Sequence, residues 1–98
     1  MTITKATSGA DLTLNVEGRI DANTAPQLEQ ALNESLDGVT NLTLNLKDLA
    51  YISSAGLRVL LMAQKRMMKQ GAMRVTNVCE AVLDVFEMTG FSDILTIE

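Results

Sequence analysis

Apolar and polar residues alternate along two segments of the chain, and a period of two is typical of a half-buried β-strand. The segments are 12–16 and 42–46, in which Leu or Val positions are separated by Thr or Asn. Shorter runs predict three more strands: one around Ile3, joined to the next by a tight turn, one at 73–76 and a last one at 94–97. The pattern therefore predicts five strands spread over the whole chain.

A helical pattern begins after the second predicted strand. Thr24 is followed by Pro26, and Gln27 stands three residues after Thr24, which is typical of a capped helix start. The residues of its apolar face recur at helical spacing: Leu28, Ala31, Leu32, Ser35 and Leu36. Gly38 is a suitable C-terminal stop.

Two more helices are predicted in the second half of the chain. A loop over 47–53 leads into a helix over 55–70, which ends at a glycine. Asn77 is then expected to cap a third helix that runs to about Met88. Its buried residues are expected to be Val82, Leu83 and Phe86.

The resulting order is β-β-α-β-α-β-α-β. Strands that alternate with helices of this length predict an α/β fold with βαβ crossovers and a mixed, mostly parallel sheet on which the helices pack. A chain of 98 residues with 47% hydrophobic residues can bury one core, so we expect a single domain over 1–98. Because only 3% of the residues are aromatic, that core must be aliphatic.

Histidine is absent and Cys79 is the only cysteine. These facts exclude a Ser-His-Asp triad, a Cys-His pair, a histidine metal site and an internal disulfide. Ser54-Ala-Gly56 resembles half of a hydrolase nucleophile elbow, but position 52 is Ile instead of Gly. Without a base to activate the hydroxyl, we expect a protein that is not an enzyme and uses no cofactor or metal.

The net charge of −4 is unevenly distributed. Residues 58–74 carry five basic side chains and no acidic one, whereas the flanking segments are acidic. One arc of the helix predicted over 55–70 gathers Arg58, Met62, Lys65 and Lys69, with Arg66 beside it. The opposite side gathers Leu57, Leu60, Gln64, Met67 and Met68. A basic arc is usually a solvated face, but Met62 within it indicates a protein-contact surface.

Two serines stand directly before this helix. Ser54, or Ser53 one residue back, is placed to be its N-cap, an ordinary structural role worth about 1 kcal/mol. The free N–H groups and the positive end of the helix dipole also favour an anion at the same place. A phosphate on Ser54 would therefore add negative charge without breaking the fold.

Three stretches in order resemble the STAS domain, as found in bacterial anti-sigma factor antagonists. Residues 51–61 resemble its signature loop and helix, residues 18–25 its turn into the first helix, and residues 89–91 the element before its last strand. The resemblance covers essentially the whole chain. It implies a protein-binding switch that regulates transcription. Such a domain binds an anti-sigma factor serine kinase when unphosphorylated, so that a sigma factor is freed, and is released when phosphorylated.

The resemblance also assigns roles to individual residues. The phosphoacceptor falls on Ser54, Asp21 matches the acidic residue near it, and Gly56 and Leu57 match the opening of the helix. Many antagonists have Asp directly before the acceptor, whereas this chain has Ser53, so either serine or neither could be modified. A metal-dependent serine/threonine phosphatase would reverse the modification. The expected partner-binding residues are Asp21, Thr24, Ser53, Ser54, Gly56, Leu57, Arg58, Met62 and Lys65.

The remaining expectations concern location and alternatives. No apolar run is long enough for a signal peptide or a membrane span, so we expect a cytoplasmic protein that binds no membrane. A pI near 4.7 argues against nucleic acid as a partner. The oligomeric state is open, with a monomer as the simplest case.

Two other functions stay open: a non-switching STAS subunit of a transport ATPase, in which the serines only cap the helix, and a nucleotide-binding module.

Overall fold

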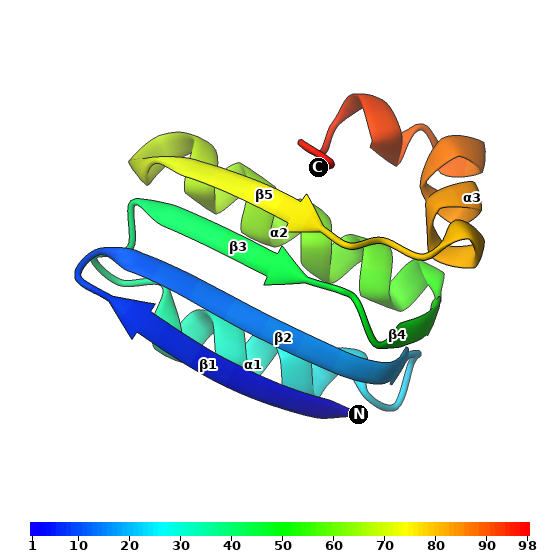
Figure 1. Cartoon of the computed structure of the whole chain (residues 1–98), viewed down its shortest axis with the longest axis horizontal. Helices are drawn as coiled ribbons and strands as arrows, with labels where there is room; N and C mark the ends of the chain where they lie inside the picture. Colours follow the sequence, from blue (N-terminus) through cyan, green and yellow to red (C-terminus); the bar gives the residue numbers. More distant parts are fainter.

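Five strands form one sheet in the computed structural model, which describes all residues from 1 to 98 (Figure 1). The strands are β1 (Thr2–Ser8), β2 (Asp11–Ile20), β3 (Asn41–Asn45), β4 (Leu49–Ile52) and β5 (Ala72–Thr76). Their order is β1-β2-β3-β5, and β4 pairs with the far end of β2. Only the β1–β2 hairpin is antiparallel, so the predicted mixed, mostly parallel sheet is confirmed.

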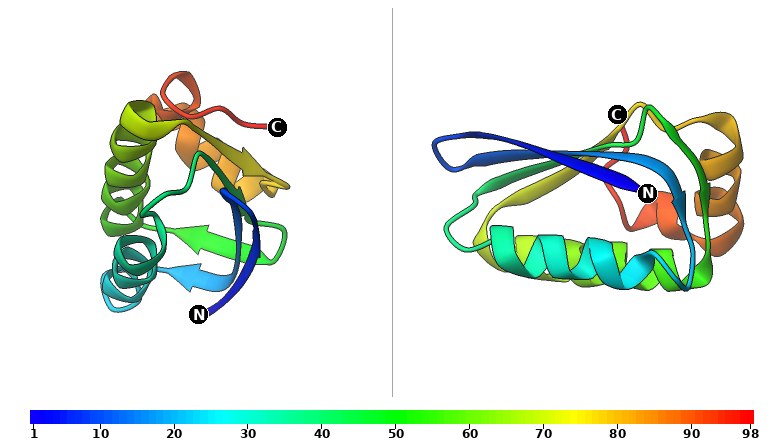
Figure 2. Two further views of the ribbon diagram at one scale, coloured as in Figure 1. Left: turned by 90° about the vertical axis from the view of Figure 1, so that its left-hand side faces the viewer. Right: turned by 90° about the horizontal axis from the view of Figure 1, so that it is seen from below.

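Three helices and one short 3₁₀ turn complete the fold. They are α1 (Ala25–Ser35), α2 (Ser54–Gln70), α3 (Glu80–Thr89) and η1 (Phe91–Asp93). Figure 2 shows α1 and α2 side by side on one face of the sheet, and α3 lies beyond the end of the sheet, against β4. None of the helices combines the length and hydrophobicity that crossing a membrane requires.

The alternating strand sequences build a two-sided sheet. Leu12, Leu14 and Val16 of β2 are buried under the helices, as are Leu42 and Leu44 of β3. The positions between them point to the other face, where polar side chains bond across strands. The Asn45 amide donates to Asn15 Oδ1 at 2.8 Å, for example. One cluster of 24 buried apolar residues, almost all aliphatic, forms the core.

The predicted loop over 47–53 is wrong in part, because β4 lies within it. β2 is ten residues long and continues past the five residues that pair with β3. Its last residues would have a free edge, and β4 fills that edge in parallel, with a register shift between Gly18 and Arg19. Burial of Leu49 and Ile52 stabilises the pairing.

Two predictions at the C-terminal end are corrected. Asn77 does not cap α3; it has a φ of 56°, which Asn tolerates, and its amide donates to Asn45 Oδ1. The N-cap position belongs to Cys79. The predicted last strand over 94–97 is reduced to a single parallel bridge between Val75 and Ile97, since η1 occupies the residues just before it.

Two predictions of burial are also corrected. Leu83 of α3 is only half-buried, whereas Val82 and Phe86 are buried as expected. Met68 was expected on the buried side of α2, but 72% of it is exposed. Met68 lies at the border of the buried arc, next to Met67, which is fully covered.

Candidate functional site

The ends of β2 and β4 bring the two predicted site segments together. Ile20 pairs with Ile52 as the last rung of the ladder, and the Ser53 N–H donates to the Ile20 carbonyl at 2.8 Å. Both strands run in the same direction, so the chain leaves the sheet at neighbouring points. Asp21 and Ser53 are therefore adjacent, and each begins the connection to a helix.

The two serines have different roles. Ser53 is the N-cap of α2, with extended backbone, and its Oγ accepts a long hydrogen bond of 3.4 Å from the Gly56 N–H. Ser53 is half-buried. Ser54 is the first residue of α2 and is exposed, and its hydroxyl forms no hydrogen bond within the protein. Of the two serines, Ser54 is the one that is exposed and whose hydroxyl is not used in the cap.

Asp21 and Thr24 hold the turn that leads into α1. One carboxylate oxygen of Asp21 accepts from the N–H groups of Asn23 and Thr24, at 2.9 and 3.1 Å. Thr24 occupies the N-cap position but does not cap α1 with its side chain. Its hydroxyl instead accepts from the Asp21 N–H and donates to the Arg19 carbonyl, both at 2.9 Å.

This network also sets the electrostatics of the turn. The Asn23 N–H, and after it the Thr24 N–H, lowers the pKa of Asp21 below its ordinary value of 3.8. The carboxylate is therefore charged at neutral pH, next to the serines. The hydrogen bonds of its side chain are all local, so Asp21 gives the turn that leads into α1 both its hydrogen bonds and a negative charge.

Gly56 and Leu57 anchor the helix start. Both are buried, so their side of α2 faces the sheet and not the solvent. A Cβ on Gly56 would lie 2.7 Å from the Ile52 side chain and closer still to that of Ile20. Gly56 thus allows the first turn of α2 to approach the sheet closely, and this approach determines where Ser54 lies.

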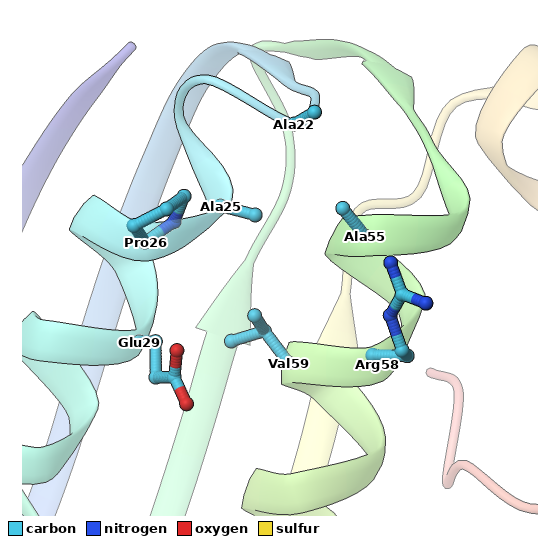
Figure 3. Close-up of a pocket in the computed structure, with 7 residues that line it drawn as sticks. All are labelled: Ala22, Ala25, Pro26, Glu29, Ala55, Arg58 and Val59. Carbon is cyan, nitrogen blue, oxygen red and sulfur yellow. The ribbon is translucent and has the colours of Figure 1, made fainter.

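A shallow groove of about 400 Å³ runs between the first turns of α1 and α2 (Figure 3). Small apolar side chains line it from both helices and from the turn before α1: Ala22, Ala25, Pro26, Ala55 and Val59. Glu29 and Arg58 lie on opposite walls. Helical periodicity correctly predicted that Arg58 lies on the exposed arc of α2. It could not predict the groove, because the groove exists only where α1 and α2 lie side by side.

The outer face of α2 carries the predicted basic arc. Arg58, Lys65 and Lys69 are exposed and form no ion pair. Met62 lies in this arc but is half-buried and packs against the core, so it offers less apolar surface than the sequence indicates. Arg66 is paired with Asp37 at the end of α1, at 2.6 Å.

Sequence reasoning missed one contact beside the serines. Arg19 and Tyr51 are paired across β2 and β4, and the Arg19 guanidinium carbon lies 4.3 Å from the centre of the Tyr51 ring. The only sequence feature that could have indicated this contact is Tyr51, the aromatic residue two positions before Ser53. No three Cys, Asp or Glu side chains come together as they would to bind a metal ion.

The family model of the STAS domain matches residues 2–98, which is nearly the whole chain. The chain belongs to the STAS domain family. The anti-sigma-B factor antagonist of Bacillus subtilis is 34% identical over 88 residues, which cover 89% of this chain and 81% of that protein. The family predicted from the three sequence stretches is therefore confirmed.

Solved structures of other proteins share the fold of this STAS domain. An anti-sigma factor antagonist from Mycobacterium paratuberculosis superposes with a TM-score of 0.88 at 25% identity, over 98% of this chain and 83% of that one. SpoIIAA shares the fold in two states. Its unphosphorylated form gives a TM-score of 0.85 at 16% identity (99% and 88% covered), and its phosphorylated form 0.76 at 15% (99% and 91%).

Proposed function

We propose that this STAS domain is an anti-sigma factor antagonist that works by partner switching. In its unphosphorylated form it binds an anti-sigma factor that is also a serine kinase, and so releases a sigma factor for transcription. The kinase transfers the γ-phosphoryl group of ATP to Ser54 Oγ, leaving ADP, and the complex dissociates. A metal-dependent phosphatase then hydrolyses the ester to serine and inorganic phosphate.

The observation that carries this proposal is the difference between the two serines. Ser53 uses its hydroxyl as the helix cap, whereas Ser54 is exposed at the first position of α2. The names of the relatives support the antagonist role, and SpoIIAA supports the switch because it exists in phosphorylated and unphosphorylated forms. Asp21 follows the strand that ends beside Ser53 and matches the acidic residue that the family resemblance expects near the acceptor.

The first turn of α2 can carry a phosphate without unfolding. The backbone N–H groups at a helix start are free of intrahelical partners, and the helix dipole is positive there. A phosphate adds about −1.5 to −2 charges at neutral pH. Because a partner that covers Ser54 would bury this charge, binding would become unfavourable, and a loss of about 3 kcal/mol weakens affinity by roughly a hundredfold.

In this proposal the domain is a binding protein and not an enzyme, and it acts in the cytoplasm, where the sigma factor and the kinase are. The kinase and the phosphatase supply the chemistry, and the domain supplies the acceptor and the docking surface. The groove between α1 and α2 lies next to Ser54 and offers small apolar side chains flanked by Glu29 and Arg58. These are suitable contacts for a side chain of the partner.

The deciding experiment is reconstitution with the cognate anti-sigma factor kinase and ATP. We expect wild-type protein to bind, to become phosphorylated on Ser54 and to dissociate. Ser54→Ala should bind without being released, Ser54→Asp should bind at least tenfold more weakly, and Ser53→Ala should still be phosphorylated. Equal affinity of all four proteins would contradict the switch. Stable association with a transport ATPase, with no phosphate on the Ser53–Ser54 peptide, would favour a structural subunit instead.

A further inference from the structure

Three exposed cations form a straight line along α2. Arg58, Lys65 and Lys69 are separated by seven and four residues, which places them within about 40° of one another around the helix axis. The line is roughly 16 Å long and starts one turn after Ser54. We call these three residues the α2 basic line. It lies in a chain of net charge −4 and is therefore a local exception.

Contacts within the protein do not account for the basic line. The two ion pairs of the structure use Arg66 and Arg74, and none of the three cations takes part in one. α2 has no acidic residue at all, so it contains no stabilising acid–base pair between successive turns. Lys69 is favoured by the helix dipole in the last turn, but Lys65 stands four residues before it and repels it. The arrangement is thus not the one that helix stability alone would favour.

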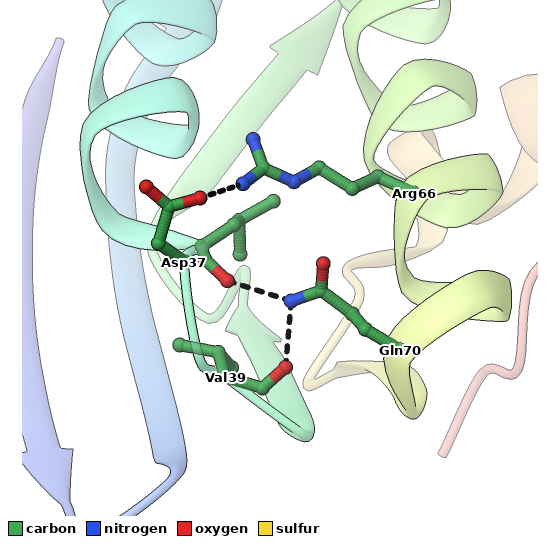
Figure 4. A network of polar contacts seen from close by, with 5 residues as sticks. Asp37, Val39, Arg66 and Gln70 are labelled. Carbon is green, nitrogen blue, oxygen red and sulfur yellow. Dashed lines mark hydrogen bonds and ion pairs between the residues drawn. The ribbon is translucent and has the colours of Figure 1, made fainter.

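The acids of the neighbouring helix do not cancel this charge. Asp37, two residues after the end of α1, is already paired with Arg66, as Figure 4 shows, and Glu34 of α1 takes part in neither ion pair of the structure. Glu29 faces Arg58 across the groove but forms no ion pair with it. The basic line therefore keeps its charge at the surface.

From this arrangement, and on the basis of the proposed function, we propose that the α2 basic line docks onto an acidic surface of the anti-sigma factor kinase and steers its association. Complementary charge raises association rates by tenfold or more, and this effect weakens with salt. The line is continuous with the groove next to Ser54, because Arg58 belongs to both. The occupant is thus the same partner that reads the serine.

Two other classes of polyanion fit less well. Attachment to anionic lipid by charge alone takes about four to eight clustered basic residues, whereas three lie here on a rigid helix in an acidic protein. Nucleic-acid binding domains are usually strongly basic, and this chain has a pI of about 4.7. A protein surface with a few carboxylates fits this small number of cations.

The same line explains how a phosphate could act beyond Ser54 itself. Ser54 and Arg58 are four residues apart, so they are neighbours on the helix surface. A phosphate of about −2 on Ser54 would reduce the +3 of the line to about +1. Phosphorylation would then weaken steering as well as close contact.

The test compares association rates for the reconstituted kinase complex. Lys65→Glu/Lys69→Glu removes most of the line, and Lys5→Glu/Lys47→Glu changes the net charge equally at exposed positions outside α2. We expect the first double variant to associate at least tenfold more slowly at low salt, with a smaller difference at high salt. The matched control should stay much closer to wild type. Circular dichroism and thermal unfolding would verify that both variants fold.

Equal association rates for the two double variants would overturn this inference while leaving the switch intact. Failure of the wild-type protein to bind the kinase would overturn the proposed function, and the inference with it. Binding of wild-type protein to phosphatidylserine vesicles, lost in Lys65→Glu/Lys69→Glu but not in the control, would assign the line to membrane lipid and contradict our proposal.

Discussion

A Cβ atom on Gly56 would lie 2.6 Å from Cγ2 of Ile20, so the backbone of α2 rests directly on the last buried side chain of β2. Ile52 of β4 meets the same position from the neighbouring strand at 2.7 Å. The first turn of α2 is thereby held against two strand ends. Ser54 is two residues from this contact, and its place on the surface depends on it.

We therefore expect Gly56→Ala to destabilise the protein despite the better helix propensity of Ala. The propensity favours Ala by up to about 1 kcal/mol, but overpacking against two buried isoleucines costs roughly 1–3 kcal/mol. Urea unfolding would measure the difference. In an Ile20→Ala background the added cost should shrink, since Cγ2 is gone. If the effects of the two substitutions on the unfolding free energy were strictly additive, the contact between Gly56 and Ile20 would not be what limits the approach of α2 to the sheet.

The Asp21 carboxylate should make stability depend on pH in the acid range. Its pKa in the folded protein is below the ordinary value of 3.8, so the folded state binds the proton less readily than the unfolded one. The stabilisation is then fully present above about pH 4 and is lost as the pH falls through the lowered folded value. Urea unfolding of wild type and Asp21→Asn between acid and neutral pH would test this. We expect the difference in unfolding free energy between them to shrink only in acid, and a difference independent of pH would contradict it.

The parts of the fold that sequence could predict are those controlled by local pattern. Segments 12–16 and 42–46 alternate regularly because one face of each strand is buried, and both are strands. The residues Leu49–Ile52 have no such alternation, since Ala50 and Tyr51 are both exposed. β4 exists because β2 extends beyond β3 and offers it an edge, and this depends on a partner some 30 residues away.

The candidate site likewise combines features that sequence could predict with features that it could not. A serine at the start of α2 could be predicted, because caps and glycines leave local signals. Which serine caps the helix could not, since the phase of α2 is decided by the contact between Gly56 and the two isoleucines. The half-burial of Met62 and the exposure of Met68 depend likewise on how much of α2 its neighbours cover, which helical periodicity does not specify.

Two contacts at the far end of α2 should differ sharply in strength, although Figure 4 shows them close together. The Gln70 amide donates to the carbonyls of Leu36 and Val39, at 2.6 and 2.7 Å, and is partly buried. Gln70→Met should cost about 1–3 kcal/mol, because the Val39 carbonyl would lose its partner. Arg66→Met breaks an ion pair to Asp37, whose side chain is 94% exposed, and should cost at most about 1 kcal/mol. Equal costs in thermal unfolding would contradict this ranking.

The two serines provide the last prediction, because stability and phosphorylation should separate between them. Ser53→Ala removes the cap of α2 and should destabilise the protein by about 0.5–1 kcal/mol, at the lower end for caps since the bond to Gly56 is 3.4 Å long. Ser54→Ala removes an exposed hydroxyl and should change stability by less than about 0.5 kcal/mol. Chemical unfolding would measure the two changes in stability, and phosphate incorporation by the cognate kinase would show which serine is modified. We expect Ser53→Ala to accept phosphate and Ser54→Ala to accept none. If phosphate were found on Ser53 instead, its hydroxyl would have to leave the Gly56 N–H first, and the cap itself would then be the switch.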